Sequence, residues 1–361
     1  MTKRVYNFNP GPAALPLPAL EKARDEFLDF AGTGMSILEV SHRSKEYEKV
    51  HNEATSLVVE LMRVPSDYKI AWLTGGASTQ FFQVPMNLMV AGKHAEYAIT
   101  GTWSEKAASE AGLFLEVKTV ASSKDKKYSY IPEGVKFGSG ASYAHITSNN
   151  TIYGTEWHYW PDTPSDVPLV CDMSSDIMGR VVDVKKFGVI YAGAQKNIGP
   201  AGVTLLIVRE DLLDRVPEKT PTMLKWKTHV KENSLYNTPP TFAIYIAKLA
   251  LEYTKEIGGI PAVERMNREK AKIVYDAIDS SGGFYKGHAR PDSRSIMNLT
   301  FRLPNEQLED EFDKEAKKRG MIGLKGHRSV GGMRASLYNA VTVEAARTLA
   351  EFMKEFQARH Q

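Results

Sequence analysis

The chain has 361 residues, of which 42% are hydrophobic and 25% are charged, and its formal net charge is +3. This is the composition of an ordinary globular protein, and the small net charge gives no reason to expect a nucleic-acid partner. No stretch of about 18 apolar residues occurs, so we expect no membrane partner and a cytoplasmic location. Cys171 is the only cysteine, which excludes an intrachain disulfide and a thiolate metal cluster, and we expect no metal site.

Helices and strands are predicted to alternate over the first two thirds of the chain. Apolar residues at spacings of three and four predict an amphipathic helix over residues 46–62, which ends before Pro65. Short apolar tracts, several of them separated by helix-length segments, predict strands at Lys69–Leu73, Tyr97–Thr100, Leu115–Val120, Tyr143–Thr147, Leu169–Asp172, Val189–Ala192 and Val203–Val208. This alternation is typical of an α/β protein with a mostly parallel sheet that helices cover on both faces.

The pattern changes in the last part of the chain. A long apolar helix over Phe242–Tyr253 is followed by a second predicted helix near residues 262–280. Apolar and polar residues then alternate from Met297 to Leu303, which predicts a half-exposed antiparallel strand. The last predicted helices lie near residues 306–318 and 343–357. We therefore predict a smaller α+β domain beginning around residue 265, since 361 residues exceed what one hydrophobic core usually serves.

Two apolar tracts of the predicted sheet end in charged residues. The tract from Val167 ends at Asp172, and the tract from Val189 ends at Lys196. Ligands of parallel α/β sheets bind at the carboxyl ends of the strands, so the acid and the amine can face one small molecule. Pyridoxal phosphate needs this pair, an amine for its aldehyde and an acid for its ring nitrogen. Taken alone, the pair is equally compatible with a surface lysine and a helix-capping aspartate.

The segment from Trp72 to Phe81 reads as a strand, a glycine-rich turn and the start of a helix. Small residues at such a turn let backbone N–H groups approach a phosphate, and the helix N-terminus favours negative charge. The segment lacks the lysine of the P-loop and the spacing of the dinucleotide fingerprint, so a single small phosphate fits best. The alternative is a simple strand-to-helix turn with Ser78 as the N-cap.

Two further strand ends carry side chains suited to a flat ring. Trp103 follows the strand Tyr97–Thr100, and an indole there can stack on a heteroaromatic ring. Thr151 follows the strand Tyr143–Thr147 and offers a hydroxyl to a phenolate or a carboxylate. The alternatives are a tryptophan that packs on its neighbours and an ordinary polar turn.

A His-Arg-Ser tripeptide occurs twice, in Ser41-His42-Arg43-Ser44 and in Gly326-His327-Arg328-Ser329. Arginine binds carboxylate and phosphate through two hydrogen bonds, and histidine can add a donor to the same anion. The turn-rich flanks of both copies favour a binding site over surface charge. We therefore expect a substrate that carries several negative charges.

The residues together resemble the phosphoserine aminotransferases, of the class V aminotransferase family within the aspartate-aminotransferase-like superfamily of pyridoxal-phosphate enzymes. The resemblance extends over essentially the whole chain and rests on Phe8–Pro12, Ser41–Ser44, Gly75–Ser78, Thr102–Ser104, Asn149–Gly154, Asp172–Ser175, Gln195–Asn197, Asn237–Thr241 and Gly326–Ser329. It implies the aspartate-aminotransferase-like fold type I, with a large cofactor-binding domain over residues 16–264. Residues 1–15 and 265–361 would form the small domain.

The resemblance also implies a homodimer with shared active sites that transfers an amino group reversibly between glutamate and 3-phosphohydroxypyruvate, giving 2-oxoglutarate and phosphoserine. Lys196 is similar to the Schiff-base lysine of the family and Asp172 to the acid that pairs with the ring nitrogen. The cofactor shell would further contain Ala77, Ser78, Trp103, Thr151 and Gln195, with Asn237 and Thr238 from the other subunit. The substrate anions would bind to His42, Arg43, His327, Arg328 and Arg334.

Three other functions remain open from the sequence. A transaminase for an unphosphorylated amino acid, such as a serine–glyoxylate transaminase, is the nearest. A cysteine desulfurase is disfavoured, because Cys171 lies inside a strand and no other cysteine can carry a persulfide. A non-catalytic module that binds a phosphorylated metabolite is the third.

The resemblance also suggests a second activity on the phosphorylated amino acid of the vitamin B6 route.

Overall fold

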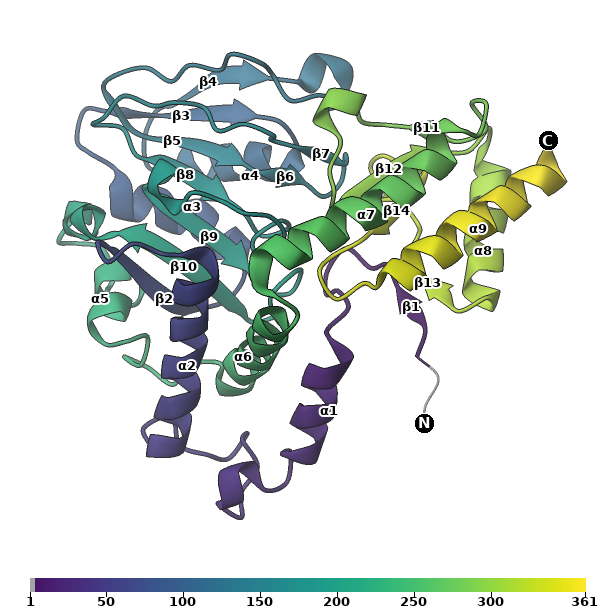
Figure 1. The fold of residues 1–361 in the computed structure, drawn as a ribbon. Coiled ribbons are helices and arrows are strands. Elements are labelled where there is room, and N and C mark those ends of the chain that lie inside the picture. Colours follow the sequence, from purple (N-terminus) through teal and green to yellow (C-terminus); the bar gives the residue numbers. More distant parts are fainter. Residues whose placement is uncertain (1–3) are drawn as a thin grey trace.

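A computed structural model describes residues 4–361, which form a large central sheet with a smaller lobe at one end (Figure 1). The central sheet has seven strands in the order β2 (Tyr68–Thr74), β10 (Val203–Arg209), β9 (Val189–Gly193), β8 (Leu169–Asp172), β5 (Ala141–Thr147), β3 (His94–Ile99) and β4 (Val117–Ser122). Strand β10 is antiparallel to both of its neighbours, and the remaining pairs are parallel. The sheet is mixed and mostly parallel, as predicted from the sequence.

Helices cover both faces of this sheet. Helices α2 (Lys45–Met62) and α6 (Thr241–Glu256) pack on one face, and α3 (Ala77–Leu88), α4 (Thr102–Ala111) and α5 (Trp226–Lys231) pack on the other. Successive residues of β8 alternate between the two cores, since Cys171 lies in the first and Val170 in the second. Burial on both faces explains why the strands read as continuous apolar tracts.

Helix α2 confirms the amphipathic helix predicted over residues 46–62. Most of its apolar side chains face the core, and Ser44 caps its N-terminus by accepting a hydrogen bond from the amide of Tyr47. Helix α1 (Leu17–Asp25) packs against α6 through a separate small core that contains Ala19 and Ala23. The segment between α1 and α2 thus lies outside the main layers, below the sheet in Figure 1.

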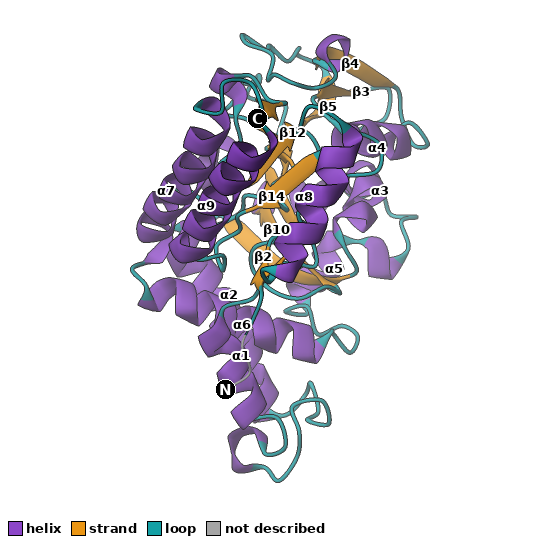
Figure 2. Cartoon of the chain, turned by 90° about the vertical axis from the view of Figure 1, so that its right-hand side faces the viewer, coloured by secondary structure: helices purple, strands orange, loops and turns teal. Residues whose placement is uncertain are grey.

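The smaller lobe has its own hydrophobic core. A three-stranded sheet of β11 (Lys286–Gly287), β12 (Asn298–Arg302) and β14 (Met333–Ser336) packs with α7 (Gly259–Asp279), α8 (Glu306–Lys318) and α9 (Val343–His360). Helices α7 and α9 lie side by side in Figure 2, and α8 lies across the strands from them. Strand β1 (Tyr6–Asn7) pairs in parallel with β13 (Met321–Ile322), which brings the start of the chain to this lobe. Because α7 runs unbroken across residue 265, the domain boundary placed there stays a prediction.

Strand β12 confirms the antiparallel strand predicted from Met297 to Leu303, since it is antiparallel to β11 and β14, but its predicted half-exposure is wrong. Within β12, Asn298 and Thr300 are as buried as the apolar residues between them. The Oδ1 of Asn298 accepts a hydrogen bond from Asn149 at 2.7 Å, and the hydroxyl of Thr300 donates to the carbonyl of Tyr153 at 2.7 Å. The polar face of β12 therefore contacts the turn that follows β5 instead of solvent.

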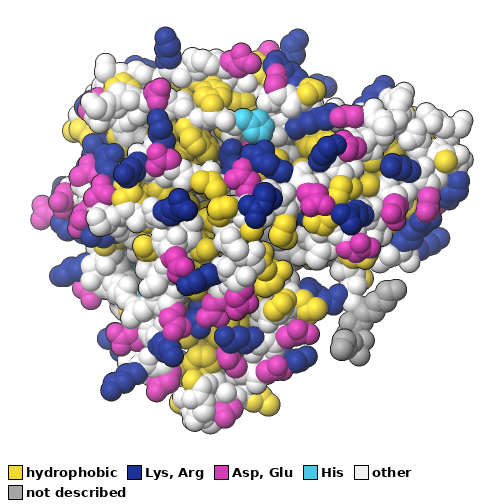
Figure 3. Space-filling model, viewed as in Figure 1, with side chains coloured by type: hydrophobic (Ala, Val, Ile, Leu, Met, Phe, Trp, Pro, Cys, Tyr) yellow, Lys and Arg dark blue, Asp and Glu magenta, His cyan; other side chains and the backbone are white. Residues whose placement is uncertain are grey.

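The remaining elements are short. Strands β6 (Asn149–Asn150) and β7 (Thr155–Glu156) form a hairpin, and 3-10 turns occur at Phe30–Gly32, Lys124–Lys126, Val184–Lys186, Glu210–Arg215, Thr222–Leu224 and Pro291–Ser293. No helix within residues 4–361 is long and apolar enough to cross a membrane. On the face drawn in Figure 3, basic and acidic side chains are interspersed, so that face carries no large field of one sign.

Candidate active site

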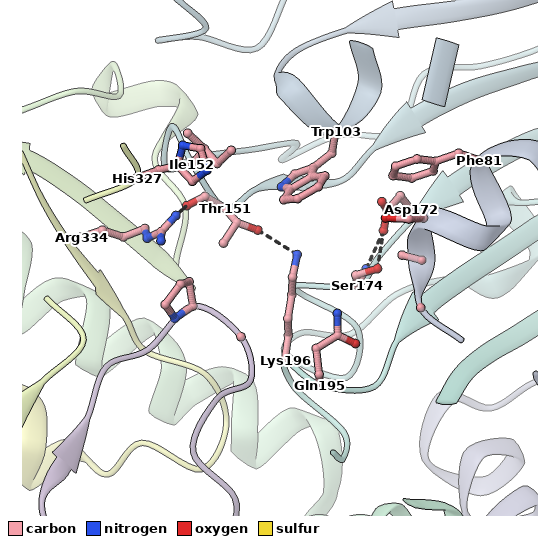
Figure 4. A pocket seen from close by; sticks show the side chains of 15 residues that line it. Phe81, Trp103, Thr151, Ile152, Asp172, Ser174, Gln195, Lys196, His327 and Arg334 are labelled. Atoms are coloured by element: carbon pink, nitrogen blue, oxygen red, sulfur yellow. Dashed lines mark hydrogen bonds between the residues drawn. The ribbon is translucent and has the colours of Figure 1, made fainter. Parts of the chain in front are cut away.

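A cavity of about 300 Å³ lies at the carboxyl ends of β8 and β9. Figure 4 shows its side chains converging from the central sheet, from α3 and α4, and from the smaller lobe. The lining consists of Pro10, Gly11, Gly76, Ala77, Ser78, Phe81, Trp103, Thr151, Ile152, Asp172, Ser174, Gln195, Lys196, His327 and Arg334.

The acid and the amine predicted at neighbouring strand ends both line this cavity. Asp172 is the last residue of β8, and Lys196 follows the last residue of β9, Gly193, by three positions. Strands β8 and β9 are parallel neighbours, with Asp172 opposite Tyr191. Both strands therefore end at the same edge of the sheet, as the sequence predicted.

The Lys196 amine lies in the middle of the cavity. Its Nζ donates a hydrogen bond to the hydroxyl of Thr151 at 3.0 Å and lies 5.5 Å from the centre of the Trp103 ring. Burial lowers the pKa of Lys196 below its ordinary value; Asp172 opposes this shift and Arg334 adds to it. A lowered pKa increases the share of neutral amine, which is the form that attacks a carbonyl.

Asp172 is buried, and only one of its two carboxylate oxygens is held by the described residues. Oδ1 accepts hydrogen bonds from the amide of Ser174 at 2.9 Å and from its hydroxyl at 2.6 Å. Burial raises the pKa of Asp172, while the positive charge of Lys196 and the two bonds from Ser174 act against this. Asp172 thus combines a fixed orientation with an oxygen available to a group in the cavity.

The N-terminus of α3 forms the end of the cavity suited to a phosphate. The helix begins at Ala77, and its N-cap is Gly76, which provides no side chain to satisfy the first N–H groups. The alternative with Ser78 as the N-cap is therefore wrong. Gly193 lies beneath this turn, where an added Cβ would come within 2.7 Å of the Oε1 of Gln195 and 3.3 Å of the Ala77 nitrogen. Uncapped N–H groups beside Gln195 and Ser78 can bind an anion.

Trp103 lies in the first turn of α4 and presents its indole to the cavity (Figure 4). Its Nε1 is buried and has no hydrogen-bond partner among residues 4–361. An unpaired buried donor beside a cavity is typical of a site whose ligand supplies the acceptor. Trp103 thus lines the cavity, and the stacking of a flat ring on its indole stays a prediction.

Two basic side chains reach the cavity from the smaller lobe. Arg334 of β14 is buried and donates from Nη1 to the carbonyl of Thr151 at 3.2 Å. Burial lowers its pKa, and its Nε has no partner among the described residues. In His327, the Nδ1 lies 2.7 Å from the hydroxyl of Ser329, and burial lowers the pKa, with further contributions from Arg334, Arg328 and Lys106. Both side chains are suited to an anionic ligand.

Five predicted residues do not line the cavity, namely His42, Arg43, Asn237, Thr238 and Arg328. The first two precede α2, the next two precede α6, and Arg328 is an exposed residue beside His327.

Six lining residues were not predicted, namely Pro10, Gly11, Gly76, Phe81, Ile152 and Ser174. Gly11 has a φ of +140°, and an added Cβ would lie 3.3 Å from the Cγ of Lys196. The sequence Asn9-Pro10-Gly11-Pro12 is rich in turn residues, but it gives no indication of the residue that the turn contacts. Ser174 lies two positions after Asp172, where an Asp-x-Ser turn could have suggested its contact with the carboxylate.

Comparisons with known proteins agree with this arrangement. The family model Aminotransferase class-V matches residues 5–349. The phosphoserine aminotransferase of Geobacillus kaustophilus (strain HTA426) is 58% identical over 99% of each chain. The solved structure of phosphoserine aminotransferase from Bacillus circulans subsp. alkalophilus is 51% identical, with a TM-score of 0.98 over 100% of each chain. That of PLP-bound phosphoserine aminotransferase from Trichomonas vaginalis is 39% identical, with a TM-score of 0.92 over 97% of this chain and 100% of that one. This chain therefore belongs to the class-V aminotransferases and, within them, to the phosphoserine aminotransferase family.

Proposed function

We propose that the protein binds pyridoxal 5'-phosphate and transfers an amino group from glutamate to 3-phosphohydroxypyruvate, giving O-phosphoserine for L-serine biosynthesis. The observation that carries this proposal is the convergence of Lys196 and Asp172 on one cavity at neighbouring parallel strand ends. The relatives that match over the whole length of the chain are named phosphoserine aminotransferase. The reaction is reversible, so phosphoserine and 2-oxoglutarate are the substrates of the opposite direction.

The cavity residues fit pyridoxal phosphate. The uncapped N-terminus of α3 with Ala77, Ser78 and Gln195 would hold its phosphate, and the unpaired indole of Trp103 would stack on its ring. Asp172 would bind the ring nitrogen through the oxygen that Ser174 does not hold. When bound, the cofactor supplies an electron sink for the substrate α-carbon.

Lys196 and Asp172 would have different roles in the reaction. Lys196 would hold the cofactor through its aldehyde until the substrate amine displaces it, and its free amine would then move a proton to and from the substrate α-carbon. Thr151, which accepts a hydrogen bond from the Lys196 amine at 3.0 Å, would orient that amine. The negative charge of Asp172 would keep a proton on the ring nitrogen, since a buried carboxylate stabilises a neighbouring cation strongly.

Basic side chains would bind the substrate. Arg334 would hold the α-carboxylate, and His327 and Arg328 would bind the phosphate or the distal carboxylate of glutamate, together with His42 and Arg43. A phosphorylated three-carbon acid carries about three negative charges near pH 7. Three arginines match that charge, and the two histidines can add N–H donors.

We further propose a homodimer in which the partner copy completes each site. His42, Arg43, Asn237 and Thr238 lie outside the lining of the cavity, so a single copy leaves them without the role that the family resemblance implies. Large apolar side chains of the same chain segments are exposed: Leu28 is 81% exposed, Leu38 56% and Tyr236 46%. A dimer interface that covers these segments would bury such side chains, which supports the proposal.

Spectroscopy of the purified protein tests the cofactor and the reaction. We expect a yellow protein whose long-wavelength absorbance is lost when glutamate is added. Borohydride should fix the cofactor covalently to wild type but not to Lys196→Ala. If the protein were colourless and still bound phosphoserine, the result would support a non-catalytic module and contradict the proposal.

Substrate comparison separates the phosphoserine reaction from other transaminations. We expect 2-oxoglutarate to accept the amino group from phosphoserine far faster than from serine. Faster transfer from serine, or a requirement for glyoxylate, would contradict the proposed substrate. The same anion-binding residues would accept 4-phosphohydroxythreonine, so we also propose a role in pyridoxine biosynthesis, which the same assay tests.

Mixed dimers test the shared site. Lys196→Ala and Arg43→Ala should each be nearly inactive as homodimers at low phosphoserine concentration. If Arg43 serves the partner's cavity, the mixed dimer places both substitutions in one site and leaves the other site intact. We then expect co-expressed, differently tagged chains to regain up to half of the wild-type activity per dimer. No recovery in the mixed dimer would show that Arg43 serves its own chain.

A further inference from the structure

Hydrogen bonds between its own backbone groups hold the loop that carries His327. It spans residues 326–332, called here the anion loop, and connects the segment after β13 to β14. The amide of Gly326 donates to the carbonyl of Gly332 at 2.7 Å, which closes the loop at its base. The amides of Val330 and Gly331 both donate to the carbonyl of His327, at 2.9 and 2.8 Å. His327 therefore lies inside a tight turn whose shape sets the direction of its side chain.

Arg302 holds this loop from the side of the small sheet. It is the last residue of β12, and its Nη1 donates to the carbonyl of Val330 at 3.1 Å. Its Nε donates to the Oε1 of Glu309 on α8 at 2.5 Å, and the same oxygen accepts the amide of Leu303 at 3.3 Å. Glu309 is buried. One edge of the guanidinium is thus held by the buried carboxylate of Glu309. Its other edge donates a hydrogen bond to the loop.

Packing against two glycines adds a second contact between Arg302 and the anion loop. An added Cβ at Gly332 would lie 2.4 Å from the Cδ of Arg302 and 2.7 Å from the carbonyl oxygen of Phe301. At Gly331 it would lie 3.3 Å from the Nη1 of Arg302. Both glycines have positive φ, of +73° and +70°. A loop with two such residues loses much conformational entropy when it is ordered, so it needs contacts that hold it.

We propose that Arg302 is a positioning residue for substrate binding: paired with Glu309, it holds the anion loop in the conformation in which His327 lines the cavity. Arg302 itself does not line the cavity, so it acts through the loop. Arg334 follows Gly332 by two residues, and its amide donates to the carbonyl of Leu324 at 2.7 Å, so the same loop base also sets the start of the Arg334 strand. The assignment of His327 to the substrate anion rests on the proposed function.

Arg302→Met tests this, because methionine keeps an apolar chain of similar length over Gly332 and removes both hydrogen bonds. We expect the KM for phosphoserine and the inhibition constant of inorganic phosphate to rise roughly threefold to tenfold, the range for side chains that must be ordered on binding. We expect kcat and cofactor content to stay within about twofold, because Arg302 contacts neither the cavity nor Lys196. Hydrogen exchange of the amides of Val330 and Gly331 should become faster.

Three further variants give the controls. Arg347→Met removes a surface arginine that pairs with Glu269 at 3.0 Å on the same lobe, and it should change none of these quantities. Glu309→Gln keeps an acceptor for Arg302 but removes the charge, so it should shift the KM in the same direction by less. The lysine in Arg302→Lys can reach only one of the two partners, so this variant should give an intermediate KM. It also replaces Arg302→Met as the test if that variant does not fold.

Separate outcomes identify which idea fails. If wild type transfers the amino group from phosphoserine and Arg302→Met has an unchanged KM and unchanged loop exchange, the positioning role is wrong. Equal losses in kcat, KM and cofactor content would mean a general structural role and would also overturn it. If wild type does not use phosphoserine, the proposed function fails, while loop exchange and phosphate binding in Arg302→Met still decide the role of Arg302.

Discussion

Ser174 fixes the orientation of Asp172 by giving the same carboxylate oxygen two hydrogen bonds, from its amide at 2.9 Å and from its hydroxyl at 2.6 Å. The hydroxyl also accepts the amide of Gly193 at 3.0 Å, at the end of the neighbouring strand. One short side chain therefore connects the acid of β8 to the strand end that leads to Lys196. Replacing Ser174 should therefore change both the unfolding free energy and the turnover rate.

Ser174→Ala should lower both the unfolding free energy and the turnover rate. The amide of Gly193 and the carboxylate of Asp172 each lose a buried partner, which costs on the order of 1–3 kcal/mol of stability. Asp172 keeps only the hydrogen bond from the backbone amide of residue 174, so it should be less well oriented, and kcat should fall roughly tenfold, about 1.4 kcal/mol. Ser175→Ala is the matched control, since its buried hydroxyl contacts Asn149 and not Asp172. Equal kcat losses in the two variants would contradict the orienting role.

Asp172→Asn and Asp172→Ala should lower kcat by at least about a hundredfold, which corresponds to about 2.7 kcal/mol. The physical reason is that neither side chain carries the negative charge that keeps a proton on the cofactor ring. Single-turnover loss of cofactor absorbance with glutamate measures the step directly, and cofactor content should fall much less. Wild-type turnover in either variant would show that Asp172 is not the partner of the ring nitrogen.

Arg43→Ala and Arg328→Ala should raise the KM for phosphoserine by about tenfold or more, about 1.4 kcal/mol, because each removes a charged partner of the anion. The effect should weaken as ionic strength rises, since both side chains are exposed. Arg268→Ala, which removes an exposed arginine paired with Glu264 on α7, is the control. Unchanged kinetics with phosphoserine would exclude either arginine from substrate binding.

His145 should make the fold less stable in acid. Burial lowers its pKa to about 3, and its Nε2 lies 2.9 Å from the hydroxyl of Tyr191. Below the unfolded pKa near 6.5, the unfolded chain binds a proton that the folded chain does not. The stability is therefore complete above pH 6.5 and decreases by up to about 1.4 kcal/mol per pH unit as the pH falls toward 3.

Denaturant unfolding of wild type and His145→Gln at pH 7, 6 and 5 measures this contribution. The variant should lack the part of the pH dependence that His145 causes. It should keep the part caused by His51, whose pKa burial lowers to about 4. Identical slopes for the two proteins would show that His145 does not titrate between the two states.

Much of the fold followed from local pattern. The strands of the central sheet, the helix over residues 46–62 and the helix over 306–318 were predicted within a few residues of β2–β5, β8–β10, α2 and α8. These elements have strong apolar periodicity, because each buries one or both faces. The strand β12 was predicted in place but with the wrong exposure, since its polar residues bond to a turn more than a hundred residues away in the chain.

The sequence by itself determined the chemistry at the centre of the site. An acid and an amine that end adjacent parallel strands must lie at one sheet edge, so Asp172 and Lys196 could be paired without coordinates. Only the tertiary structure decided what surrounds them. It brought Gly11 against Lys196, Ser174 under Asp172, and Arg302 under the loop of His327. The contacts of Gly11 and Arg302 depend on how distant segments pack, and strand or helix periodicity carries no information about which segments meet. The contact of Ser174 with Asp172 is local, but the bond from the amide of Gly193 to the Ser174 hydroxyl depends on the pairing of two strands.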